Sequence, residues 1–162
     1  MRILIIVLIA MAGTLPKCNK GKVSATSGLI EKVSLSIHQY PMKEVLIYDT
    51  DSSSLRVRLL NNSLGVDSLL AERQVDLKGF QIYESDISKF DQELYANQCI
   101  QDGQVITLAF MKNDSTLRKV RFSNYYHEGL EKVINFINSN VDSVYSISYN
   151  RDQLIGEMKK CK

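Results

Sequence analysis

Two stretches of alternating apolar and polar residues constrain the fold more than any other feature of the chain. In "LRVRL", residues 55–59, the apolar side chains alternate with Arg56 and Arg58. In "TLRKVRF", residues 116–122, Lys119 and Arg121 share one face. Alternation with a period of two indicates a strand with one buried side. Each stretch follows an apolar run and an Asp/Ser-rich turn, so the sequence predicts two β-hairpins.

The clearest helical pattern follows the second hairpin. Within residues 124–141, an apolar stripe at helical spacing is formed by Tyr126, Leu130, Val133, Ile134, Ile137 and Val141. Asn150 and Gln153 resemble a capping box, which predicts a C-terminal helix over residues 151–160. Shorter helices are predicted at residues 66–70 and 85–97, from apolar side chains three or four residues apart.

These elements predict an α+β fold for residues 29–162, taken as a single domain. An antiparallel sheet would carry two main helices on one face. Strand, turn and strand occur twice, and a candidate helix follows each time. The domain is therefore also interpreted as two related β-β-α halves, with chance similarity between hairpins as the alternative.

Residues 1–17 have the layout of an export signal. Arg2 precedes an apolar run from Ile3 to Ala12, which is too short to span a bilayer. Cleavage after Ala12 is one route, and cleavage before Cys18 is the other. The second route resembles the bacterial lipoprotein signal, because Leu15 lies three residues before Cys18 and a polar tether, residues 18–28, follows. The resemblance implies a lipid on Cys18 and a periplasmic or outer-envelope location.

Charge excludes one class of partner. Removing residues 1–17 removes Arg2 and Lys17 but no acid, so 18 of the 20 basic residues remain against 18 acidic ones. A near-neutral chain without a Lys/Arg tract lacks the electrostatic footprint of a nucleic-acid binder. Neither His38 nor His127 has a metal ligand at a recognised spacing, and no glycine-rich phosphate loop is present. We therefore expect no metal and no cofactor.

The chain has three cysteines: Cys18, Cys99 and Cys161. If Cys18 is lipidated, an even pair remains in an oxidising compartment, which predicts a Cys99–Cys161 disulfide. That bridge would close a loop of about 60 residues and stabilise the fold by ~4 kcal/mol. Two free thiols, or a catalytic Cys99 beside His38 or His127, are the alternatives. No cysteine-hydrolase signature surrounds Cys99, so we predict no catalytic residue.

If the two hairpins join one sheet, Arg56, Arg58, Lys119 and Arg121 can share its exposed face. Fixed guanidinium groups bind carboxylates in a bidentate manner, so this face is a candidate site for an acidic protein or glycan. Tyr125, at the start of the best helix, is a further candidate contact. Decoration of a solvated face for solubility is the alternative.

Together these features predict an exported domain of the cell envelope that is non-catalytic and contacts the membrane only through its lipid anchor. Its role would be binding or inhibition, as in an immunity protein. Two alternatives remain: a small exported hydrolase that uses Cys99 or His127, and a structural envelope lipoprotein.

Overall fold

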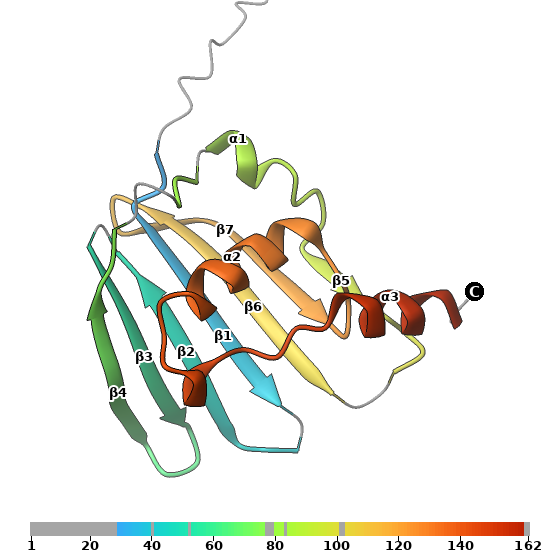
Figure 1. Cartoon of the computed structure of the whole chain (residues 1–162), viewed down its shortest axis with the longest axis horizontal. Helices are drawn as coiled ribbons and strands as arrows, with labels where there is room; N and C mark the ends of the chain where they lie inside the picture. Colours follow the sequence, from blue (N-terminus) through green and yellow to red (C-terminus); the bar gives the residue numbers. More distant parts are fainter. Residues whose placement is uncertain are drawn as a thin grey trace, which may run out of the picture.

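The computed structural model describes residues 29–39, 41–51, 53–76, 80–82, 84–100 and 103–160. They form a seven-stranded sheet in the order β4-β3-β2-β1-β6-β7-β5 (Figure 1). The strands are β1 (Lys32–Gln39), β2 (Glu44–Thr50), β3 (Ser54–Asn61), β4 (Val66–Gln74), β5 (Leu94–Ala96), β6 (Gln104–Lys112) and β7 (Ser115–Ser123).

The sheet is almost entirely antiparallel. β1 to β4 form a meander, and β6 pairs with both β1 and β7. Only the short β5 is parallel to its neighbour, β7. Both predicted hairpins are present, as β2–β3 and β6–β7, and the predicted α+β class is confirmed.

Helices cover one face of this sheet (Figure 1). α2 (Glu128–Asn138) packs across it, and α3 (Arg151–Lys160) lies near the start of α2. Alternate residues of the central strands face the helices and are buried, as the alternation predicted for β3 and β7: Val33, Leu35, Ile37, Tyr48, Leu55, Val57, Ile106, Leu108, Phe110, Val120 and Phe122. α2 contributes Leu130, Val133, Ile134 and Ile137, which are four of the six residues of the predicted stripe.

The segment after α2 returns across the sheet and carries α3 into place. The Tyr48 hydroxyl donates to the Tyr145 carbonyl at 2.7 Å, and burial raises the pKa of Tyr48 to about 12. The Asn138 side chain donates to the Ile147 carbonyl at 2.9 Å and accepts from its backbone nitrogen at 2.7 Å. A short 3-10 helix, η2 (Ser143–Tyr145), lies in this segment. Side chains therefore fix the path of this non-regular backbone.

The helix predicted at residues 66–70 is wrong, because this segment belongs to β4. The register against β3 shifts by one residue between Val57 and Arg58, so Leu70 is an extra residue in β4. A bulge breaks the two-residue alternation and leaves apolar residues at a spacing that imitates a helix. The first hairpin therefore continues into a further strand, and the interpretation as two β-β-α halves is also wrong.

The helix predicted at residues 85–97 is mostly wrong. Only α1 (Glu84–Ile87) is helical, and a turn closed by the Phe90 nitrogen on the Ile87 carbonyl ends it. Leu94 lies in β5 and is 52% exposed, so it is not part of a buried stripe with Ile87 and Phe90. The C-terminal helix was predicted with its correct bounds.

Three predicted features lie outside the described residues: the signal segment, the tether with Cys18, and Cys161. Among the helices that are described, none is long and apolar enough to cross a membrane.

Candidate functional site

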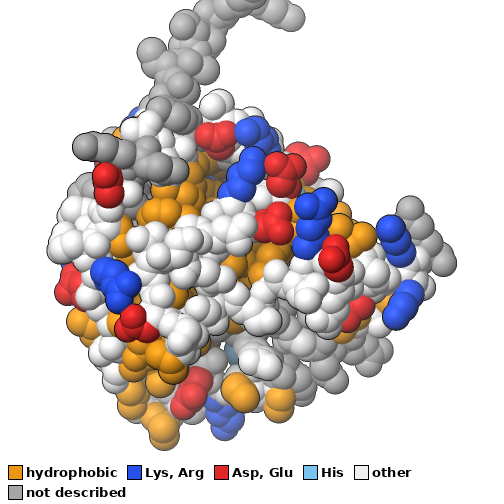
Figure 2. Space-filling view, viewed as in Figure 1, with side chains coloured by type: hydrophobic (Ala, Val, Ile, Leu, Met, Phe, Trp, Pro, Cys, Tyr) orange, Lys and Arg blue, Asp and Glu red, His pale blue; other side chains and the backbone are white. Residues whose placement is uncertain are grey.

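A groove of about 840 Å³ lies on the helical face, between α2 and the segment that carries α1. We call it the α1–α2 groove. Its walls include Phe80, Phe90, Phe110 and Phe136, which are four of the chain's five phenylalanines. Orange hydrophobic side chains are visible in the hollow between α1 and α2 in Figure 2. The volume lies in the range of pockets that bind small molecules.

The aromatic walls are packed against one another. Phe80 stacks on Phe136 with ring centroids 4.0 Å apart, and Phe90 stacks on His127 at 4.7 Å. Gly129, in the first turn of α2, allows the close approach of Phe90: a Cβ atom at Gly129 would lie 2.7 Å from Phe90 Cζ. The groove therefore has an ordered, apolar interior.

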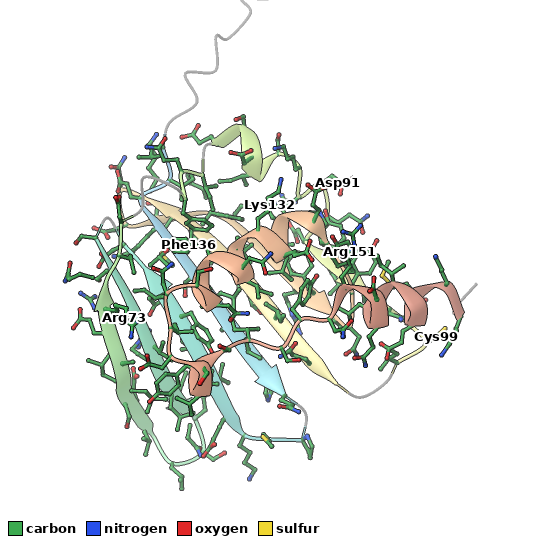
Figure 3. The ribbon with its side chains drawn as sticks, in the orientation of Figure 1. Arg73, Asp91, Cys99, Lys132, Phe136 and Arg151 are labelled. Carbon is green, nitrogen blue, oxygen red and sulfur yellow. The ribbon has the colours of Figure 1, made fainter. Side chains whose placement is uncertain are left out.

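Charged side chains stand at the rim in pairs of opposite sign. Lys89 Nζ lies 2.7 Å from Asp86 Oδ1, and Lys132 Nζ lies 3.0 Å from Glu128 Oε1. Lys132 projects from α2 one turn before Phe136 (Figure 3). Because each pair is neutral, the rim presents no net charge to a ligand.

His127 forms one end of the groove and begins α2. Its backbone is extended, at φ −142° and ψ 126°, and its Nδ1 accepts from the Gly129 backbone nitrogen at 3.1 Å. This bond satisfies one of the free N–H groups of the helix start, the role usually taken by Ser, Thr, Asp or Asn. The stacking of Phe90 on the His127 ring ties α2 to the segment after α1.

Burial lowers the pKa of His127, against the smaller opposing effects of Asp91, the Lys89 backbone and Glu128. The ring also lies within an aromatic cluster of Phe90, Tyr95 and Phe122. The neutral imidazole, with Nδ1 as acceptor, is therefore the form that the structure holds. Within the described residues, no group of three His, Cys, Asp or Glu side chains could hold a metal ion.

The opposite face of the sheet has no helix over it and carries the predicted basic residues. The strand register places Arg56 opposite Asp49, and Lys119 opposite Ala109. All four basic residues, Arg56, Arg58, Lys119 and Arg121, lie on this face, but β2, β1 and β6 separate β3 from β7. The four side chains therefore form two separate groups.

The Arg56–Arg58 group is already neutralised. Arg58 donates to Asp49 Oδ2 through Nε at 3.1 Å and Nη2 at 2.8 Å, and to Asp67 Oδ2 through Nη1 at 2.8 Å. Arg56 donates through Nε to Glu72 Oε1 at 2.7 Å. These partners raise the pKa of both guanidinium groups, chiefly through the hydrogen bonds to Glu72 and Asp49. An acidic ligand would have to displace these carboxylates.

The Lys119–Arg121 group is different. Both side chains are exposed, and neither forms an ion pair with a described residue. They lie beside the outer edge of β7, in a shallow groove with Glu93, Leu94 and Leu117.

Two other predicted residues lie away from the open face. Tyr125 follows β7, and its ring lies 5.4 Å from that of Tyr95. Its carbonyl accepts from the Tyr149 hydroxyl at 3.0 Å. Cys99 lies in the turn after β5, close to the C-terminal end of α3 in Figure 3. The neighbouring Ile100 and residues of α3 line one pocket, so this turn and α3 are adjacent.

The α1–α2 groove was not predicted from the sequence. Its walls come from four separate parts of the chain: Phe80, Phe90, Phe110 and Phe136. The available signal was compositional, because phenylalanine is concentrated in residues 80–136. That signal is equally typical of an ordinary core, and only the packing of α1 away from α2 leaves a hollow.

Comparison with known protein families, with characterised proteins and with solved structures finds no match to this chain.

Proposed function

We propose that this protein is an exported, non-catalytic binding domain of the cell envelope, and that the α1–α2 groove holds an apolar group of its ligand. The observation that carries this proposal is the groove itself, with about 840 Å³ between α1 and α2 and four phenylalanines in its walls. Concave, mostly apolar sites with a few polar groups at the rim are the usual binding sites of proteins.

The state of His127 supports a binding role over a hydrolytic one. A general base needs a free nitrogen within reach of the proton that it removes. Nδ1 of His127 accepts from the Gly129 nitrogen, and the ring is packed among Phe90, Tyr95 and Phe122. The imidazole thus holds α2 against the groove wall, and its removal would distort the site without removing a catalytic group.

A ligand in this groove would present an apolar or aromatic group together with an uncharged or zwitterionic polar part. The aromatic walls favour the apolar group through burial and stacking. The paired rim charges favour neither a purely anionic nor a purely cationic head, because Lys89 and Lys132 are each compensated by an acid.

Blocking the groove tests this proposal. Asn135 lines the groove from an exposed position of α2, so Asn135→Trp should fill it without disturbing the core. We expect titrations with the uncharged, apolar fluorescent dye Nile red to show binding at least tenfold weaker, since a blocked pocket loses most of the apolar area it buries. Ser143→Trp is the matched control, exposed in η2 and away from the groove. Equal dye binding by both variants would refute the proposal.

The membrane tether and the disulfide belong to the same proposal. Cys99 lies beside α3, whose last residue, Lys160, precedes Cys161 directly. This proximity supports a bridge that would hold α3, which has no buried residue, against the sheet. Intact mass of the protein made in a bacterial host tests both parts. We expect an N-terminal lipid on Cys18 and a gain of two hydrogens on reduction; an unprocessed Met1 would contradict export.

A further inference from the structure

The outer edge of β7 is only partly covered. β5 pairs with Arg121–Ser123, and no described strand lies beside Thr116–Val120 on that side. The Arg121 nitrogen donates outward to the Glu93 carbonyl at 2.8 Å, and the Ser123 carbonyl accepts from Asn97 at 3.0 Å. Backbone groups of alternate residues point to the same side of a strand, so the N–H and C=O of Lys119 also point outward.

An unpaired strand edge is a template for another strand. Here the edge opens into a shallow groove of about 640 Å³, lined by Glu93, Leu94, Arg121 and residues 116–119. Leu94 is 52% exposed, and Leu117 is 46% exposed because a register shift leaves it as an extra residue in β7. The groove therefore offers backbone groups and two apolar side chains at one place.

The side-chain charges beside the β7 edge indicate the chemistry of its partner. Lys119 and Arg121 are two residues apart, so both point to the open face beside this edge. Neither has a carboxylate partner among the described residues, in contrast to Arg56 and Arg58. An added strand along Thr116–Val120 with acidic side chains at every second position would place a carboxylate directly opposite Lys119 and diagonally within reach of Arg121, whose own edge pairs with β5.

We propose that the β7 edge binds an extended acidic segment of a partner protein, which adds a strand to the sheet at Lys119 and pairs its alternate carboxylates with Lys119 and Arg121. Backbone hydrogen bonds supply affinity in such strand addition, and alternate side chains supply specificity. This surface lies on the face of the sheet opposite the α1–α2 groove. Binding at the β7 edge is therefore independent of binding in the groove.

A second copy of this chain does not fit the edge. In any antiparallel pairing around Lys119, the basic side chains of the two copies would lie close together. Like charges across a strand pair are destabilising. The same two residues thus disfavour self-association while they favour an acidic strand.

Fluorescence anisotropy with defined probes tests the proposal. The probe is a fluorescein-labelled peptide of nine alternating threonine and glutamate residues, titrated with the purified protein. Lys119→Glu combined with Arg121→Glu should weaken binding by about tenfold or more, because two favourable charge pairs become two repulsive ones. Lys159→Glu with Lys160→Glu is the control, since it makes the same charge change at exposed positions of α3.

Methylation of every backbone nitrogen of the probe separates strand addition from simple charge attraction. We expect the methylated peptide to bind at least tenfold more weakly, because it cannot donate backbone hydrogen bonds. We also expect slower hydrogen exchange at the Lys119 amide when the unmodified peptide is bound.

Any of three results would overturn the proposal. One is no binding of the unmodified peptide at millimolar concentration, and another is equal weakening by the β7 and α3 variants. The third is equal affinity for the methylated peptide or for an acidic oligosaccharide of the same charge, which would indicate electrostatic attraction without strand pairing.

Discussion

The two β-hairpins of this protein have nearly the same sequence pattern but different surfaces. In β2–β3, Arg56 and Arg58 are held by carboxylates on both neighbouring strands. In β6–β7, Lys119 lies between Ala109 of β6 and an open edge, and Arg121 lies between Thr107 of β6 and Leu94 of β5, so neither has an acidic cross-strand neighbour. The same alternation thus produces a neutral ion-pair network in one hairpin and free cations in the other.

The difference shows that the chemistry of an exposed basic residue depends on its neighbours across the sheet. β3 lies between two strands that supply Asp49, Asp67 and Glu72. β7 is next to the last strand, and the three-residue β5 leaves most of its edge open. Only the second group is available to a partner without breaking existing bonds.

Charge reversal at one residue of each group should separate them most clearly. Arg58→Glu should lower the free energy of unfolding by about 1–2 kcal/mol, because it leaves Asp49 and Asp67 facing a new negative charge. Arg121→Glu should change the free energy of unfolding by less than about 0.5 kcal/mol. Urea unfolding followed by circular dichroism measures both, and equal losses would remove the distinction between the two hairpins.

Supplying the second hairpin with a missing carboxylate should make it resemble the first. Ala109→Asp places an acid opposite Lys119, as Asp49 lies opposite Arg56. A double-mutant cycle between Ala109→Asp and Lys119→Ala should show a favourable coupling of about 0.5 kcal/mol. The Thr-Glu peptide should also bind the Ala109→Asp variant more weakly than the wild type. A coupling of zero would mean that the register does not bring the two side chains together.

The smallest effect is expected at the turn of the first hairpin. Burial would raise the pKa of Asp51, but hydrogen bonds from Ser53 and Ser54 and the charge of Arg56 lower it overall. A carboxylate with a lowered folded pKa stabilises the fold above its unfolded pKa of about 3.9, and this stabilisation is lost as the pH falls further. The free energy of unfolding of the wild-type protein should therefore exceed that of Asp51→Asn by about 0.3 kcal/mol at pH 6. The urea midpoints of the wild type and Asp51→Asn should converge as the pH is lowered from 6 to 3. A difference between the two midpoints that grows toward pH 3 would contradict a lowered pKa of Asp51.

Much of the fold was predictable because local pattern and tertiary environment agree there. The alternation around Arg56 and Arg58 is that of a strand with one buried side, and β3 has that environment. The stripe through Leu130 and Ile137 likewise matches the buried side of α2. The helix predicted at residues 66–70 is the clearest wrong prediction. An extra residue in β4, Leu70, disrupts the alternation from which the strand would be recognised.

The candidate sites were less predictable. His127 was considered as a catalytic residue, but it begins α2 and accepts from Gly129. That role depends on a two-residue contact that no periodicity reveals. The open edge beside Lys119 depends on where β5 ends, and β5 was predicted as part of a helix.

The sequence by itself determined the class of fold, the two hairpins, the main helices and which face of β3 and of β7 is buried. These follow from side-chain periodicity, which is a local property of the chain. Only the tertiary structure decided which basic residues are neutralised, where the phenylalanines enclose a groove and which strand edge stays open. Those properties depend on neighbours brought together from distant parts of the chain, and local periodicity carries no information about them.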